Sequence, residues 1–185
     1  MATQTIAPPT PGTYVVDKAH TEVGFVARHL IGTKVRGRFT DFEATLTIAD
    51  PPEQSSLEAD AVAASIETGN SMRDDHLRTN DFLDAPTFPK LTFKSTGLTK
   101  ESEGEWKLAG DLTIRGITKP VVFDLEYHGT GPGMQPDAEV VAFSASTEID
   151  RREFGVSFNA PLANGGLVVG NKVKIELEVE AALQK

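Results

Sequence analysis

The residues best suited to chemistry form one short run, Arg73-Asp74-Asp75-His76, which brings together a cation, two carboxylates and an imidazole. Acid–base catalysis needs such groups within hydrogen-bond reach of one substrate. Asp75 and His76 are adjacent in the sequence, so on a helix they point in different directions and cannot form a relay. The run also fits a capped helix whose charges tie it to neighbouring strands. An enzyme that uses Asp74, Asp75 and His76 is therefore kept as an alternative to a binding protein.

The sequence does not indicate other kinds of catalytic or metal site. The histidines have no metal-ligand spacing such as an i, i+4 pair with a glutamate; they are His20, His29, His76 and His128. The chain has no cysteine, which excludes thiol catalysis and zinc–thiolate sites. No nucleophile elbow, phosphate-binding loop or paired-acid signature occurs. The sequence thus predicts no catalytic residue, no metal and no cofactor.

Positive charge gathers in one stretch of the chain. Residues 23–40 include no acidic residue although the net charge is −9, and their basic residues are Arg28, His29, Lys34, Arg36 and Arg38. Lys34, Arg36 and Arg38 are spaced by two, so on a strand they share one face. Such a row suits the oxygens of a phosphate. The alternative is a cross-strand ladder with a second row spaced by two, Glu176, Glu178 and Glu180.

The elements that must position these groups are strands. Apolar and polar residues alternate in 106–115, 121–128 and 172–180, a period of two that places one face of a strand against an interior. Clusters of Gly, Pro, Asn and Asp separate such runs at 50–52, 97–104, 129–137 and 164–166. We count eight to ten strand candidates, which predicts an all-β sandwich or barrel.

Two segments depart from this pattern. Residues 71–79 predict a short helix with Ser71 as its N-cap, ended by the proline at 86. Residues 1–12 are rich in Thr, Pro and Gly and predict a disordered leader. We expect a single domain over residues 13–185.

Length and charge limit the classes of function. A chain of 185 residues fits one domain without disulfides. The net charge of −9 argues against nucleic-acid binding and against broad adhesion to anionic lipid surfaces. No apolar run has the length of a membrane span, so stable membrane insertion is not expected. The N-terminus lacks the features of a secretory signal, which predicts a cytoplasmic protein; a secreted form after signal removal is the alternative.

Periodicity does not determine whether the interior of the expected barrel is filled by side chains or hollow. Ten phenylalanines are distributed over many of the expected strands. An eight-stranded barrel is just wide enough to hold its own side chains or one slender ligand. Alternation alone therefore does not distinguish a filled barrel, which would serve as an interaction module, from a hollow one.

Many blocks of the chain resemble the YceI-like family. They include the opening at 14–30, the stretch at 35–42, Ser65-Ile66-Glu67-Thr68-Gly69-Asn70, the segment 73–82, 110–121 and Ile149-Asp150-Arg151-Arg152-Glu153-Phe154-Gly155. The resemblance covers residues 13–182. It implies an extended, lipocalin-like antiparallel β-barrel that binds polyisoprenoid chains in an elongated pore, with no catalytic residues and no metal.

From the resemblance we expect a non-enzymatic protein that binds, stores or transports a long isoprenoid lipid, either a polyprenyl phosphate or an isoprenoid quinone. Strand-face reasoning adds a set of aromatic and apolar cavity residues: Phe25, Phe42, Phe93, Trp106, Phe123, Phe143 and Leu177. The predicted head-group contacts are Arg28, Lys34, Arg36 and Arg38. A lipid-modifying enzyme and a filled interaction module are the alternatives, and a homodimer is left open.

Overall fold

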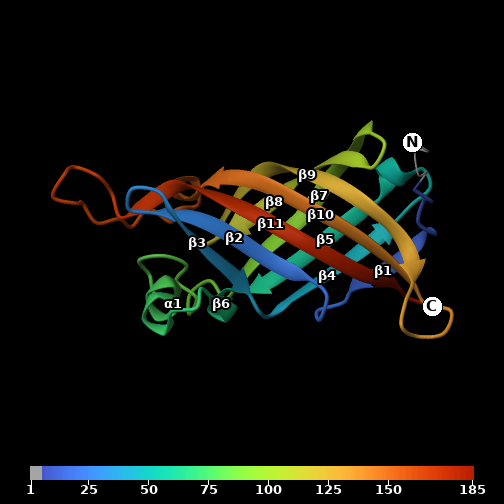
Figure 1. Cartoon of the computed structure of the whole chain (residues 1–185), viewed down its shortest axis with the longest axis horizontal. Helices are drawn as coiled ribbons and strands as arrows, with labels where there is room; N and C mark the ends of the chain where they lie inside the picture. The colour runs from blue at the N-terminus through green and yellow to red at the C-terminus, as the bar shows by residue number, and fades with distance from the viewer. Residues whose placement is uncertain (1–5) are drawn as a thin grey trace.

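The computed structural model describes residues 6–185 and consists mainly of strands (Figure 1). The strands are β1 (Gly12–Val16), β2 (Glu22–His29), β3 (Thr33–Phe39), β4 (Phe42–Ile48), β5 (Ser56–Val62), β6 (Ile66–Glu67), β7 (Lys90–Ser102), β8 (Glu105–Ile114), β9 (Ile117–Pro132), β10 (Glu139–Asp150) and β11 (Val169–Leu183). One α-helix, α1 (Ser71–Arg78), and three 3-10 helices, η1 (Pro52–Gln54), η2 (Ala63–Ser65) and η3 (Arg151–Phe154), complete the described elements.

Eight strands close into an antiparallel barrel. Their order is β1-β4-β5-β7-β8-β9-β10-β11, and β1 pairs with β11 to close the ring. The start of β1 and the C-terminus lie at one end of the barrel and α1 lies at the other (Figure 1). We call these the terminal end and the helix end. The predicted antiparallel barrel of about eight strands with a short helix is confirmed.

The ring is modified at the helix end because β11 changes partner along its length. Residues 181–183 of β11 pair with β1, whereas residues 169–178 pair with β2. β3 pairs with β2, and its other edge pairs only with the two residues of β6. Beside this edge lie β6 and α1 (Figure 1). The wall of the barrel is thus completed at the helix end by a helix rather than by a full strand.

Local chemistry explains where α1 begins. The side chain of Asn70 accepts a hydrogen bond from the backbone N–H of Arg73 at 3.1 Å, which makes Asn70 the N-cap. Ser71 is the first helical residue, so its predicted role as the cap is wrong by one position. No helix within residues 6–185 is long and apolar enough to cross a membrane.

The inward face of each long strand is apolar, but much of it is incompletely buried. Buried clusters stand at the helix end, around Phe82 and Phe154, and at the terminal end, around Tyr14 and Val141. Between them Leu177, although it points inward, is only half-buried. Inward side chains that are not fully covered by protein atoms must border an empty space.

Candidate ligand-binding cavity

A cavity of about 260 Å³ runs along the inside of the barrel toward the helix end. Nearly all of its lining side chains are apolar; the charged exceptions are Glu43, Asp60 and Arg151. The volume contradicts a barrel filled by its own side chains. Because the lining offers few groups that form hydrogen bonds, the space suits a hydrocarbon chain.

The lumen stays open in part because an aromatic ring lies against the wall rather than across it. Phe93 of β7 covers Gly110 of β8, where an added Cβ would collide with the ring. The same ring meets Phe123 edge-on, with 5.4 Å between ring centroids. Glycine thus provides the recess that lets a large side chain occupy little of the lumen.

A second cavity, of about 290 Å³, lies toward the terminal end. Side chains that belong only to this cavity include Trp106, Leu125 and Tyr127. Four side chains line both cavities and come from four different strands: Leu46, Leu57, Leu108 and Phe143. Leu46 and Leu57 are direct cross-strand partners. We call this group of four the septum, since the two cavities lie on either side of it.

The second cavity is partly covered by the segment that precedes β1. Ile6, Pro8 and Pro9 line this cavity. The hydroxyl of Tyr127 donates a hydrogen bond to the carbonyl of Ala7 at 3.0 Å. The predicted leader, 1–12, lies outside the described residues over 1–5; residues 6–11 have no regular secondary structure, and β1 begins at Gly12.

Glu139 holds the same segment in place. Its carboxylate accepts hydrogen bonds from the N–H of Thr10 at 2.9 Å, the hydroxyl of Thr10 at 2.6 Å and the hydroxyl of Tyr14 at 2.8 Å. The bonds from Thr10 lower the pKa of Glu139. Burial, and then the hydrogen bond to Glu139, raise the pKa of the Tyr14 hydroxyl above its ordinary value.

At the helix end the main cavity is bounded by the segment around α1. Leu77, Phe82 and Leu83 line the cavity. The ring of His76 packs edge-on against Phe82 and against Phe158, with centroid distances of 5.0 and 5.1 Å. These contacts join the α1 segment to the loop before β11, so the two together cover this end.

One buried cation anchors that loop. Arg151 is 5 % exposed, and its guanidinium donates to the carbonyls of Val156 at 2.7 Å, Phe158 at 2.9 Å and Gly170 at 3.0 Å. Burial lowers the pKa of Arg151. Arg151 thus binds both ends of the 156–170 loop and holds them together; we call these contacts the Arg151 clamp.

The predicted cavity residues divide between the two spaces. Trp106 lines only the second cavity. The other six line the main cavity: Phe25, Phe42, Phe93, Phe123, Phe143 and Leu177. That any of them contacts a ligand stays a prediction.

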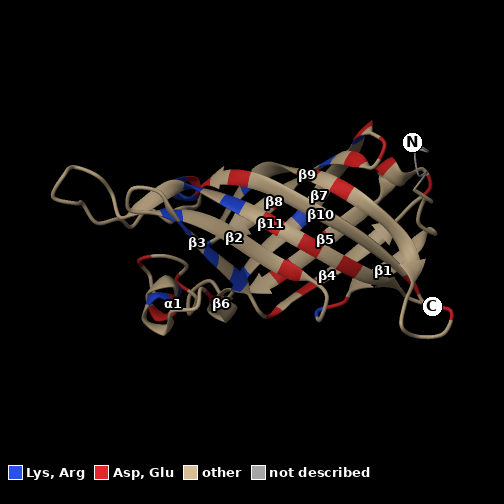
Figure 2. Cartoon of the chain, viewed as in Figure 1, with Lys and Arg blue, Asp and Glu red and all other residues tan. Residues whose placement is uncertain are grey.

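The predicted basic row lies on the outer face of the barrel near the helix end, where Figure 2 shows blue residues along β3. Arg36 pairs with Glu176 at 3.3 Å, the one contact of the expected ladder among the described ion pairs. Arg38 pairs instead with Glu67 of β6 at 3.0 Å. Arg28 and Lys34 have no carboxylate partner within the described part of the chain. None of the four lines the main cavity.

Arg73 and Asp74 of the acid–base run both bond to the hydroxyl of Thr68, whereas Asp75 and His76 bond to other residues. Asp74 is buried and accepts hydrogen bonds from the N–H and the hydroxyl of Thr68 at 2.9 and 2.5 Å. Asp75 pairs with Arg78 at 2.9 Å, and His76 pairs with Asp81 at 2.8 Å. None of the three lines either cavity. These bonds hold the helix against the residues around it.

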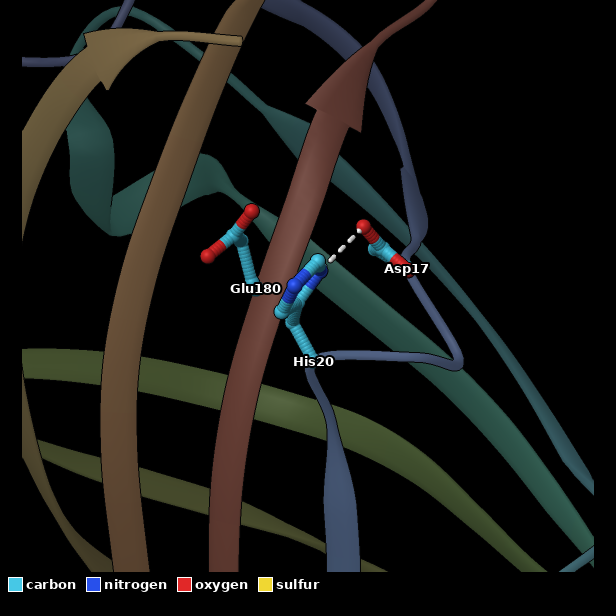
Figure 3. A group of neighbouring side chains, drawn as sticks. All are labelled: Asp17, His20 and Glu180. Atoms are coloured by element: carbon cyan, nitrogen blue, oxygen red, sulfur yellow. Dashed lines mark hydrogen bonds and ion pairs between the residues drawn. The ribbon is translucent and has the colours of Figure 1, made fainter. Parts of the chain in front are cut away.

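Long-range strand pairing also assembles a group that sequence spacing does not reveal. Within residues 6–185, Asp17, His20 and Glu180 are the one set of three whose carboxylate and imidazole atoms lie within 4.8 Å of one another (Figure 3). His20 Nδ1 lies 2.8 Å from Asp17 Oδ2, which lowers the pKa of Asp17 and raises that of His20. Asp17 also accepts from the N–H of Ala19 at 2.9 Å. These bonds close the turn between β1 and β2.

Sequence reasoning missed the cavity residues contributed outside the long strands. They include Leu77, Phe82, Leu83, Arg151, Phe154 and Val156. An apolar side chain on an otherwise charged helix, such as Leu77, indicates a buried contact and could have been found. The position of Arg151 follows only from the three-dimensional path of the loop that it binds.

Comparison with known proteins relates this barrel to a family. A model of the YceI-like domain matches residues 14–181. A UPF0312 protein of Staphylococcus aureus (strain COL) is 35% identical over 174 residues, which cover 93% of this chain and 98% of that protein. A second, from Staphylococcus aureus (strain bovine RF122 / ET3-1), is 33% identical over the same coverage.

Solved structures show the same fold. The YCEI protein of Campylobacter jejuni has a TM-score of 0.72 and 31% identity, covering 91% of this chain and 96% of that one. Burkholderia cenocepacia BcnA has a TM-score of 0.75 and 23% identity, covering 89% and 98%. A polyisoprenoid binding domain from Saccharophagus degradans has a TM-score of 0.68 and 11% identity, covering 95% and 100%.

Proposed function

The chain belongs to the YceI-like domain family, and we propose that it binds a long isoprenoid lipid in its main cavity, to store or transport it without catalysing a reaction. The observation that carries the proposal is the hollow, apolar interior of the barrel. The polyisoprenoid binding domain of similar fold gives it additional support.

Burial of hydrocarbon supplies the binding energy in this proposal. Each CH₂ group moved from water into an apolar site contributes roughly 0.8 kcal/mol. A chain of several isoprene units can therefore bind tightly with almost no polar contact. Side chains that lie over glycines, such as Phe93 over Gly110, leave space in the lumen for a branched hydrocarbon.

The head group would lie outside the main cavity, because the lining contains few polar groups. Arg28, Lys34, Arg36 and Arg38 lie on the outer face near the helix end. In a polyprenyl phosphate complex these residues would meet the phosphate; an isoprenoid quinone would not need them. Salt distinguishes the two lipids, since screening weakens only the binding of a charged head group.

The decisive experiment is to purify the protein without detergent, extract it with organic solvent and identify the lipid by mass spectrometry. We expect a stoichiometric isoprenoid. Protein that is repeatedly free of lipid, and that fails to take up either a polyprenyl phosphate or a quinone added in solution, would overturn the proposal.

The proposal that the protein is not an enzyme rests on the separated side chains of Asp74, Asp75 and His76. The lipid-modifying alternative predicts that His76→Ala abolishes turnover of a bound lipid. We expect this variant to keep its lipid chemically unchanged, with a loss of stability because the contacts of His76 with Phe82 and Asp81 are removed.

A further inference from the structure

We propose that the helix end of the barrel docks on an anionic membrane surface, with the turn at Leu30-Ile31 and the nearby Leu167 entering the lipid interface. The inference goes beyond lipid binding in the cavity. It concerns where the protein meets a bilayer, and it is tested with vesicles that contain no isoprenoid.

The turn between β2 and β3 carries apolar side chains at a position that favours polar ones. Ile31 is 96 % exposed and Leu30 is 47 % exposed. Leu30 also adopts a left-handed backbone conformation, with φ of 52°, where glycine or asparagine is more favourable. An exposed apolar turn that in addition costs backbone strain indicates a functional contact.

The neighbouring loop extends this apolar tip. The N–H of Leu30 donates to the carbonyl of Val168 at 2.8 Å, so the turn lies directly beside the end of the 155–168 loop. Leu167 in that loop is 47 % exposed. Figure 1 shows both loops projecting from the barrel at the helix end. The hydrogen bond places the turn beside the end of the loop, and we call Leu30, Ile31 and Leu167 together the apolar tip.

Cations flank the tip. Arg28 and Lys34 are cross-strand partners in the same hairpin. Arg28 donates to the carbonyl of Gly32 at 2.8 Å, and neither residue has a carboxylate partner in the part of the chain that the structure describes. Figure 2 shows blue residues along β3, whereas the acidic residues lie over the middle and the terminal end of the barrel and around α1. An apolar tip beside cations is the composition of peripheral membrane anchors.

The charge distribution sets the orientation. With a net charge of −9 the protein as a whole is repelled by an anionic bilayer, so Arg28 and Lys34 beside the apolar tip must supply the local attraction. The strands that support the tip also line the main cavity, through Phe25 and Ala27 of β2 and Val169 of β11. Docking in this orientation would bring the covered end of the cavity against the membrane.

Flotation of the whole protein with vesicles tests the proposal. Vesicles of phosphatidylcholine mixed with phosphatidylglycerol should carry the protein upward at low salt, and added salt should release it. Vesicles of phosphatidylcholine alone should carry a much smaller fraction of the protein upward. Both vesicle types lack isoprenoid, so a protein that proves to bind no isoprenoid could still dock.

Matched variants locate the contact. Ile31→Ser and Leu167→Ser should each weaken binding to the phosphatidylglycerol vesicles about tenfold, because each removes an apolar side chain that enters the lipid interface when the protein docks. Lys34→Gln should weaken it about fivefold. Met134→Ser, at an equally exposed apolar side chain of the terminal end, should leave binding unchanged. Circular dichroism of each variant establishes that it is folded.

Two results would overturn the proposal. One is that the folded wild-type protein does not float with phosphatidylglycerol vesicles. The exposed apolar tip would then be a contact for a protein partner instead of a membrane. The other is an equal loss of binding in Met134→Ser and Ile31→Ser, which would show that binding does not depend on the helix end. In either case the lipid extracted from the purified protein still tests the proposed function separately.

Discussion

The ring of Phe25 on β2 occupies the space that a side chain at Gly37, its direct partner on β3, would take. The three atoms nearest to a Cβ at position 37 all belong to this ring. Phe25 is half-buried, lines the main cavity and lies 6.0 Å from Phe39 between ring centroids. The pair repeats the arrangement of Phe93 over Gly110, so two strand pairs keep their phenylalanine rings against the wall.

Replacing this glycine should narrow the main cavity. Gly37→Ala must move the Phe25 ring into the lumen, which removes contacts worth one or two CH₂ groups. We expect lipid affinity to fall roughly tenfold, about 1.4 kcal/mol, measured by displacement of a bound fluorescent lipid. Gly97→Ala is the control, because an added Cβ there meets open space. Equal affinities of the two variants would contradict this account of the wall.

Shortening Phe143 should join the two cavities. Phe143→Ala removes the largest side chain of the septum, and we expect the variant to co-purify with longer isoprenoid chains than the wild type, measured by mass spectrometry. Phe123→Ala is the matched control, since Phe123 is as deeply buried but lines only the main cavity. Each substitution should cost about 3–5 kcal/mol in stability. A similar shift in chain length in both variants would show that the septum does not limit the ligand.

Glu139 and Tyr14 should make stability depend on pH at both extremes. The pKa of Glu139 is lower in the folded protein, so its contribution is present above its ordinary value of 4.5 and is lost as pH falls through the folded value. The pKa of Tyr14 is raised, so its contribution is present below its ordinary value of 10.0 and is lost as pH rises above that value.

Urea unfolding at a series of pH values tests both limbs. Glu139→Gln should flatten the acid limb, and Tyr14→Phe should flatten part of the alkaline limb, where Tyr127 also has a raised pKa. Each should lower the free energy of unfolding at neutral pH by about 1 kcal/mol through lost hydrogen bonds. An unchanged acid limb in Glu139→Gln would disprove the role of this carboxylate.

Arg151 should contribute far more to stability than its neighbour Arg152. Arg151→Met leaves several carbonyls of the 156–170 loop without their donor, and we expect a loss of about 3 kcal/mol in the free energy of unfolding. Arg152 is exposed and pairs with Asp150, whose pKa it lowers to about 2. Arg152→Met should therefore cost less than about 1 kcal/mol. If chemical denaturation gave comparable losses in the free energy of unfolding for the two variants, the stabilising role of the Arg151 clamp would be disproved.

Sequence periodicity predicted the strands well where one face of the strand is buried and the other is exposed to solvent. Val173, Ile175 and Leu177 line the cavity as their spacing requires, while Lys172 and Lys174 face outward. The helix at 71–78 was also predicted, with an error of one residue in its cap, because Asn70 and Ser71 are both good capping residues. Local chemistry determines these features, so the sequence is enough to find them.

The candidate site was harder to predict because it depends on register and on distant segments. A hollow interior requires that Phe25 face Gly37 across two strands, which only the pairing of β2 with β3 establishes. Trp106 was assigned to one cavity and lines another, since periodicity places a residue inside but not at a level along the barrel. For the basic row the sequence left open a cross-strand ladder with glutamates or an anion site. In the structure Arg36 pairs with Glu176, whereas Arg28 and Lys34 pair with no carboxylate of the described residues.

The adjacency of β1 and β11, with Tyr14 opposite Leu183, has a practical consequence for handling the protein. A fusion partner, an affinity tag or a linker to a solid support that is joined to residue 185 therefore starts from the terminal end. Coupling to a sensor chip through the C-terminus should therefore leave α1 and the projecting loops facing the solution.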